Sequence, residues 1–140
     1  MPKERTEVIS LPGPRGKGFG RMGWWITAFT LLLIAEKPRH GYEIATELKR
    51  IGFPIFGVAQ MGVIYRTLSD LEAGGFVISS WDTSTSPPRK VYRITPLGFE
   101  YLSEMAFEVK TYKDMMDTFI ERFSNIGGES DERGDNERDS

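Results

Sequence analysis

Apolar side chains in the last third of the chain recur at alternating steps of three and four residues, beginning just after Thr95-Pro96. A hydroxyl followed by proline is typical of a helix start, because the hydroxyl caps the first turn and proline suits the first helical position. The alternation is an a/d heptad pattern, which needs a partner helix to cover it. We therefore predict a C-terminal helix over 96–126 whose dimerisation seam consists of Leu102, Met105, Val109, Tyr112, Met116, Phe119 and Phe123.

A second apolar block lies near the start of the chain. Eleven of the fourteen residues from Met22 to Ala35 are apolar, and Lys37-Pro38 follows them. This block is too short to cross a bilayer, which takes about 20 residues. A helix that is apolar on nearly every side belongs in a core or in a dimer interface. We predict a central helix over Met22–Glu36.

Two shorter helices are predicted in the middle of the chain. The first spans about Gly41–Ile51, with Ile44, Ala45, Leu48 and Ile51 on one face, and Gly52 closes it as a C-cap. Residues 53–62 are expected to form a loop. The next helix spans about Met61–Ala73 and ends at Gly74-Gly75. Its spacing turns Ile64, Leu68 and Leu71 inward and Tyr65, Arg66, Ser69 and Asp70 outward.

Two β-rich segments follow, Phe76–Trp81 and Lys90–Thr95. The eight residues between them are too many for a tight turn, so they form an extended tip that carries Arg89 beside Lys90. Three helices followed by such a hairpin are the order of a winged helix-turn-helix. The predicted fold class is therefore mainly α with a small β-hairpin, with a DNA-binding domain over 21–95, a wing over Ser84–Lys90, and N- and C-terminal dimerisation helices.

The charge is unevenly distributed along the chain. The net charge is −2, but residues 1–21 and 37–95 each carry +3, while residues 96–124 carry −3 and residues 129–140 carry −4. Residues 1–20 are rich in proline and glycine and are expected to form a flexible basic arm. Residues 127–140 contain no apolar side chain and are expected to form a disordered acidic tail. The positive charge of residues 37–95 matters more for the choice of partner than the net charge of the whole chain.

The composition argues against most enzymes and metal proteins. The 140 residues include no cysteine and a single histidine, His40, which excludes disulfides, thiolate metal sites and multi-histidine sites. No nucleophile–base pair or phosphate-binding glycine loop is visible. We expect no catalytic residue, no metal and no cofactor. No secretory signal is evident and no membrane role is expected, so a cytoplasmic location is predicted.

Three stretches together resemble the PadR family of bacterial transcription regulators. They are LLLIAEKPRHGYEIATELKR (31–50), GVIYRTLSDLEAGGFVISSW (62–81) and PPRKVYRITPLGFEYL (87–102). The single C-terminal helix is similar to the smaller subgroup, and the wing text also resembles a subgroup linked to polyhydroxyalkanoate storage. The resemblance implies a homodimer built on the N- and C-terminal helices, and operator binding by the third helix and the wing, usually in repression.

The sequence departs from the family pattern at the start of the third helix. Val63 stands where a small polar residue often follows the glycine, and Gln60-Met61 stand where Ser/Asp-Pro is common. Gln60 can pair with adenine, and apolar side chains can touch a thymine methyl group. Phosphate contacts suit tyrosine hydroxyls and basic groups. The candidate DNA-binding residues are Tyr42, Lys49, Gln60, Met61, Val63, Tyr65, Arg66, Arg89 and Lys90.

Two interpretations stay open at this point. Tyr42 suits phosphate contact at a helix N-terminus and core packing equally well. Aromatic and methionine side chains at a dimer seam either pack the dimer core or line an adaptable apolar pocket for an aromatic effector, as in small members of the family. The candidate ligand-binding residues are Trp24, Trp25, Phe29, Met115, Met116 and Phe119.

The sequence thus predicts a dimeric, sequence-specific regulator that binds a palindromic double-stranded operator, and the resemblance implies that it is a repressor. A small apolar or aromatic effector would weaken operator binding by changing the distance between the recognition helices. The alternative is a winged-helix module for protein–protein contact, which would bind duplexes weakly and be indifferent to Tyr65 or Arg89.

Overall fold

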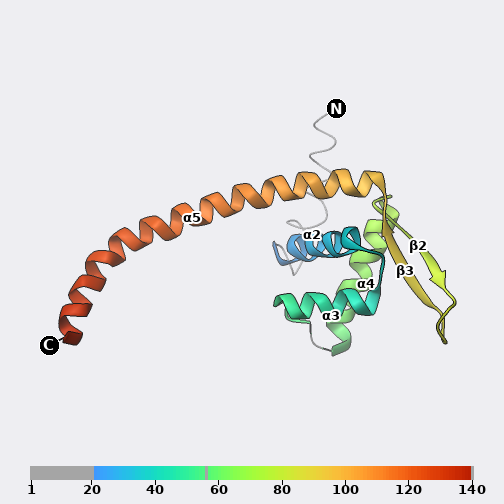
Figure 1. Ribbon diagram of the computed structural model, residues 1–140, viewed down its shortest axis with the longest axis horizontal. Coiled ribbons are helices and arrows are strands. Elements are labelled where there is room, and N and C mark those ends of the chain that lie inside the picture. Colours follow the sequence, from blue (N-terminus) through green and yellow to red (C-terminus); the bar gives the residue numbers. More distant parts are fainter. Residues whose placement is uncertain (1–20, 56, 140) are drawn as a thin grey trace. The chain divides into compact units, whose positions relative to one another are not determined.

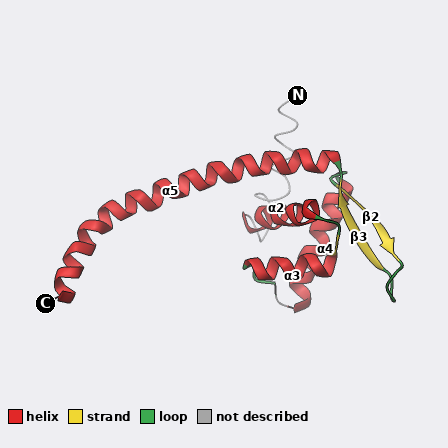
Figure 2. Ribbon diagram, in the orientation of Figure 1, coloured by secondary structure: helices red, strands yellow, loops and turns green. Residues whose placement is uncertain are grey.

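The computed structural model describes residues 21–55 and 57–139, so the predicted basic arm, 1–20, lies outside them. It is mainly helical with one small antiparallel sheet, which confirms the predicted fold class. The chain divides into two compact units between Met105 and Ala106. In chain order, the elements are α2 (Arg21–Glu36), β1 (Arg39–His40), α3 (Gly41–Ile51), α4 (Gly57–Ala73), β2 (Val77–Asp82), β3 (Arg89–Ile94) and α5 (Pro96–Asp139). Figures 1 and 2 label all of them except the two-residue β1.

Helix α2 is the centre of the first unit. It packs against α3, α4 and β3, and Leu31 and Ile34 are 0% and 1% exposed. Few positions on it reach the surface, which is why its apolar residues follow no single stripe. The prediction of a central helix over Met22–Glu36 is confirmed to within one residue.

Helix α3 has the predicted bounds, because its start and its end are set by local groups. Its core face holds Ile44, Ala45 and Leu48, all buried. Gly52 has φ 127°, a backbone conformation that favours glycine, and its N–H donates to the carbonyl oxygens of Leu48 and Lys49. Ile51 was predicted on the buried face, but it is 47% exposed because it occupies the last turn beyond the covering elements.

Helix α4 begins at Gly57, four residues before the predicted start at Met61. The prediction of a loop over 53–62 is therefore wrong for its second half. Glycine costs a helix only about 1 kcal/mol relative to alanine, so Gly62 does not interrupt it. The predicted faces are confirmed, since Ile64, Leu68 and Leu71 are buried and Tyr65, Arg66, Ser69 and Asp70 are exposed.

The sheet has the order β1-β3-β2, and both strand pairs are antiparallel. Both strands of the hairpin lie one residue closer to its tip than predicted, so that Asp82 pairs with Arg89 while Phe76 and Thr95 lie outside the strands. Strand β1 has only two residues, too few for a recognisable alternation, and it was not predicted. It places His40 opposite Val91 and so joins the start of α3 to the sheet.

Helix α5 starts as predicted. The Thr95 hydroxyl accepts a hydrogen bond from the Gly98 N–H at 2.9 Å and donates to the Gly75 carbonyl oxygen at 2.7 Å. The first turns belong to the first unit, where Tyr101 stacks on Phe76 with ring centroids 4.5 Å apart and Met105 is fully buried. The cap therefore fixes the helix start against the end of the hairpin.

The rest of α5, from Ala106 onward, forms the second unit. The helix continues to Asp139, through the segment 127–139 that composition predicts to be disordered. The physical reason is that an existing helix adds residues without a new nucleation cost. Among the described residues, no helix has the length and apolar character to span a membrane.

Gly98 provides a stability test of the α5 start. A Cβ atom there would lie 2.0 Å from the Phe76 carbonyl oxygen, whereas a Cβ at Gly62 in α4 would meet nothing within 4 Å. Gly98→Ala should lower the free energy of unfolding by about 2–3 kcal/mol through overpacking against backbone. Gly62→Ala, the matched control, should raise it by about 0.5–1 kcal/mol. Urea unfolding followed by circular dichroism measures both, and equal stability of the two variants would contradict the packing at Gly98.

Candidate nucleic-acid interface

The exposed face of α4 carries the central candidate residues. Tyr65 is 46% exposed and Arg66 is exposed, while Ile64 between Val63 and Tyr65 is fully buried. Gln60, Met61 and Val63 are half-buried two to five residues earlier in the same helix. The helix thus rests on its apolar side and leaves a polar and aromatic side accessible.

Tyr65 also links α4 to the start of α3. A Cβ atom at Gly41 would lie 2.6 Å from Tyr65 Cε1 and 2.9 Å from its hydroxyl, so the phenol ring crosses α3 where only glycine leaves room. The next residue, Tyr42, is 66% exposed, which excludes core packing as its role. The Tyr65 ring therefore lies against the first turn of α3, and the exposed side chain of Tyr42 belongs to that same turn.

Lys49 does not join this group. It is exposed in the last turn of α3, at the opposite end of the helix from Tyr42. Seven residues separate the two positions, which is about 10 Å along the axis. Its neighbour Arg50 pairs with Glu47 at 3.2 Å. Lys49 therefore adds charge to the far end of the helix.

The wing carries a third exposed group. Arg89 and Lys90 are exposed on β3, and the Lys90 Nζ atom lies 6.0 Å from the ring centroid of Trp81 on β2. An ammonium group at that distance from an indole face is weakly attracted to it. Trp81 is 65% exposed, and sequence reasoning did not select it, because it looked like an ordinary strand residue.

His40 connects the start of α3 with the base of the wing. Its ring Nδ1 lies 3.0 Å from Glu43 Oε1, and its Nε2 lies 3.2 Å from Asp82 Oδ2. The His40 backbone N–H donates to Glu43 Oε1 at 2.8 Å, and this bond is the main cause that holds the pKa of Glu43 below its ordinary value. Hydrogen bonds from Ser84 are the largest cause that lowers the pKa of Asp82, and the hydrogen bond with His40 comes next.

The candidate ligand-binding residues fall into both units. In the first unit Trp24 is 2% exposed, and Trp25, Phe29 and Phe53 form a chain of ring contacts with centroids 6.3 and 5.4 Å apart. In the second unit Met115, Met116 and Phe119 are 61%, 52% and 71% exposed. Trp24 is thus a core residue of its own chain.

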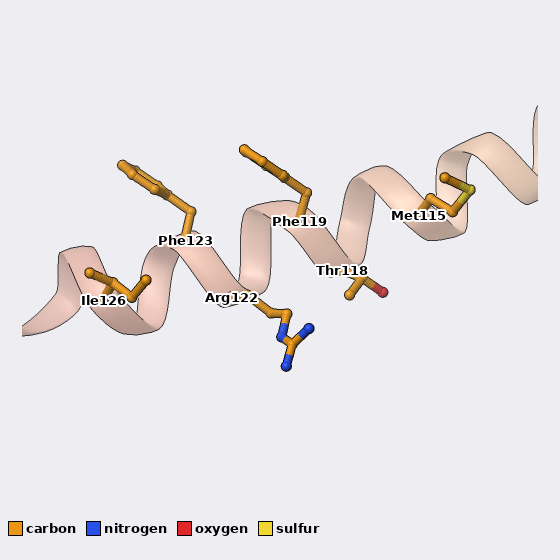
Figure 3. Close-up of a pocket in the computed structure, with 6 residues that line it drawn as sticks. All are labelled: Met115, Thr118, Phe119, Arg122, Phe123 and Ile126. Atoms are coloured by element: carbon orange, nitrogen blue, oxygen red, sulfur yellow. The ribbon is translucent and has the colours of Figure 1, made fainter.

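The side chains of the predicted dimer seam become more exposed toward the C-terminal end of α5. Met105 is fully buried in the first unit, and Leu102, Val109 and Tyr112 are half-buried. The last three seam residues are exposed: Met116, Phe119 and Phe123. Figure 3 shows Phe119 and Phe123 side by side on one face of the helix, with Arg122 on another. No group of three or more acidic or histidine side chains in the described part could hold a metal ion.

Comparison with known proteins identifies a family and two relatives. The model of the family described as "Transcriptional regulator PadR-like family" matches residues 30–104. An uncharacterized protein X of Lysinibacillus sphaericus is 35% identical over 97 residues, which cover 69% of this chain and 88% of that protein. Transcriptional regulator Rv3488 of Mycobacterium tuberculosis is 36% identical over 70 residues, which cover 50% of this chain and 62% of that protein.

Solved structures give the same result. A conserved protein of unknown function, TM0937, described as a potential transcriptional factor, is 49% identical with a TM-score of 0.68. The match covers 79% of this chain and 96% of that one. A PadR family transcriptional regulator from Eggerthella lenta is 26% identical with a TM-score of 0.58, covering 85% of this chain and 93% of that one.

Proposed function

The chain belongs to the PadR-like family of transcriptional regulators, and we propose that it acts as a homodimeric repressor that binds a palindromic operator. The observation that carries the proposal is the division of α4 into a fully buried apolar side and an accessible side bearing Tyr65 and Arg66. A helix supported in this way suits the major groove, where its first turns meet base edges and its flanks meet phosphates.

The wing and the start of α3 supply the flanking contacts. Arg89 and Lys90 are exposed on the hairpin, and Tyr42 is exposed in the first turn of α3. Guanidinium, ammonium and phenol groups are suitable donors to phosphate oxygens. Gln60, Met61 and Val63 then face the bases, with the amide of Gln60 suited to adenine and the apolar pair to a thymine methyl group.

Dimerisation is supported by the exposed apolar side chains of α5. Met116, Phe119 and Phe123 continue the heptad pattern whose earlier member, Met105, is buried. A contiguous apolar stripe of this kind in a single chain marks an interaction site. With two-fold symmetry, two recognition helices would meet half-sites about 34 Å apart, which is one turn of the duplex.

An apolar or aromatic effector is part of the proposal. The exposed thioethers of Met115 and Met116 beside the Phe119 ring provide an adaptable apolar lining at the proposed seam. An effector bound there would favour one spacing of the half-sites over another and so shift the population of DNA-competent dimers. The half-buried rings of Trp25 and Phe29 give the first unit an aromatic cluster of similar chemistry.

Duplex binding measured by fluorescence anisotropy tests this function. The labelled duplex comes from the region upstream of the protein's own coding sequence, and a scrambled duplex of equal composition is the control. We expect preferential binding that weakens steeply with salt, because each neutralised phosphate contributes about −0.9 to the slope of log K against log salt. A selection from genomic fragments then defines the operator.

Two results would contradict the proposal. One is equal, weak binding to both duplexes together with no enriched fragment in the genomic selection. The other is binding that is indifferent to changes at Tyr65 and Arg89. Either result would favour the use of the winged helix as a protein-binding module.

A further inference from the structure

His40 is the single histidine of the chain, and both of its ring nitrogens face carboxylates. Nδ1 lies 3.0 Å from Glu43 Oε1 on α3, and Nε2 lies 3.2 Å from Asp82 Oδ2, which is 42 residues away at the end of β2. The imidazole is partly buried, with 17% of its side chain exposed. One ring therefore spans the gap between the helix-turn-helix and the wing.

Each carboxylate is tied to its own element by other bonds. Glu43 Oε1 accepts the His40 backbone N–H at 2.8 Å, which fixes it to the first turn of α3. Asp82 Oδ1 accepts the Ser84 N–H at 3.0 Å and the Ser84 hydroxyl at 2.6 Å, which fixes it to the start of the wing loop. The second oxygen of Asp82 is directed to His40. Asp82 thus couples the shape of the wing loop to the position of the imidazole.

The number of protons on the ring decides how many of these contacts are hydrogen bonds. A neutral imidazole has one N–H donor, whereas imidazolium has two. With both carboxylates ionised, only imidazolium donates to Glu43 and Asp82 together, and both bonds are then charge-assisted. In the neutral form one carboxylate faces a nitrogen lone pair. The wing contact is therefore strong in one protonation state and weak in the other.

The two carboxylates that face His40 do not change their charge near neutral pH, so the protonation of His40 decides the strength of the contact. The pKa values of Glu43 and Asp82 are held below their ordinary values, so both stay ionised near neutral pH. Arg89 lies opposite Asp82 in the strand register, and Lys37, in the turn before β1, helps to lower the pKa of Glu43. Near His40, Arg39 is engaged by Glu36 at 2.8 Å and Arg93 by Ser80 at 3.2 Å.

We propose that His40 is a positioning residue whose protonation fastens the wing to the start of α3, so that DNA binding is tighter in mildly acidic than in mildly alkaline solution. This inference rests on the proposed function, because the wing carries Arg89 and Lys90 to the duplex. A fastened wing holds these two groups at a fixed distance from α4, and less ordering is then required on binding. Histidine is the side chain suited to such a switch between about pH 5 and pH 8.

The first test uses the free protein. In the 15N-labelled full chain, the Ser84 amide signal is followed from about pH 6 to about pH 8, together with the ring signals of His40. We expect the Ser84 amide to move with the ring signals in the wild type. It should stay in place in His40→Gln, whose amide does not titrate. A Ser84 signal that ignores the His40 titration, or that moves equally in His40→Gln, would overturn the proposal.

The second test measures duplex affinity at the two ends of that pH range. Relative to His40→Gln, the wild type should bind about five- to tenfold more tightly at about pH 6 than at about pH 8. Asp82→Asn should lose this dependence although it keeps the histidine. Glu47→Gln, which removes a charge from the same helix at a site paired with Arg50, should retain it. Thermal unfolding of each variant confirms that it is folded.

Asp82→Asn separates this model from a direct phosphate contact by His40. If the imidazolium bound phosphate itself, removal of a competing carboxylate would preserve or increase the pH dependence, and that result would reject the positioning role. The two proposals also fail separately. If no duplex is bound at any pH but the Ser84 amide still follows His40, the DNA-binding function is wrong and the fastening of the wing stands.

Discussion

Arg89→Ala/Lys90→Ala is expected to weaken binding to the preferred duplex by about two orders of magnitude, because the two proposed charge-assisted phosphate contacts would be lost. It should also reduce the slope of log K against log salt by about two, since two fewer counterions are released. Both side chains are exposed on β3 and neither has a carboxylate partner among the described ion pairs. Their removal should therefore leave the fold intact.

Tyr65 tests the same surface with a smaller change. Tyr65→Phe keeps the ring that crosses Gly41 and removes only the hydroxyl, so a single hydrogen bond is at stake. We expect affinity to fall about five- to tenfold, with unchanged thermal stability. Tyr65→Ala removes the ring as well and should have a larger effect.

The control for the charge change lies on α5. Lys110→Ala/Lys113→Ala also removes two exposed positive charges, but from the second unit, where Lys113 is paired with Asp117 at 2.8 Å. Its effect on affinity should be less than about threefold, because neither lysine belongs to the proposed recognition helix or wing and exposed charges without a direct phosphate contact are largely screened in physiological salt. Equal losses in the two double variants would show that net charge, and not the wing, determines affinity.

The parts of the fold that the sequence predicted well are those set by neighbouring residues. Helix α3 has the predicted bounds because neighbouring residues set both of its ends. Gly52 caps its C-terminus, and the residues after Pro38 begin its first turn. Helix α5 starts as predicted because Thr95 caps it through the Gly98 N–H. The buried side of α4 was predicted because Ile64, Leu68 and Leu71 have helical spacing, although the helix begins earlier than predicted, at Gly57.

The parts that were missed depend on residues far apart in the chain. Strand β1 exists only because β3 offers Val91 and Tyr92 to pair with it, and two residues show no pattern alone. The contact between His40 and Asp82 joins positions 42 residues apart, and nothing in either local sequence indicates it. The predicted helix start at Gly41, the residue after His40, is correct, but the link from His40 to the wing requires the assembled sheet.

Met116→Asp/Phe119→Asp is expected to convert the proposed dimer into a monomer. In a symmetric seam the double substitution would bury four carboxylates, and each unpaired buried charge costs several kcal/mol, more than a helix seam provides. Both side chains are exposed in the single chain, at 52% and 71%, so the fold of the first unit should not change. Light scattering should give one 15.9 kDa chain in place of two.

Loss of the dimer should also weaken operator binding by about 100-fold or more, because the second half-site is then bound without the advantage of linkage to the first. Phe107→Asp is the matched control, since Phe107 is 73% exposed on the same helix but lies outside the a and d positions that form the predicted seam. It makes the same chemical change without placing a charge in the seam, so the mass should stay at two chains. A double variant that remains dimeric, or a Phe107→Asp variant that dissociates equally, would show that the seam of α5 is not where the chains meet.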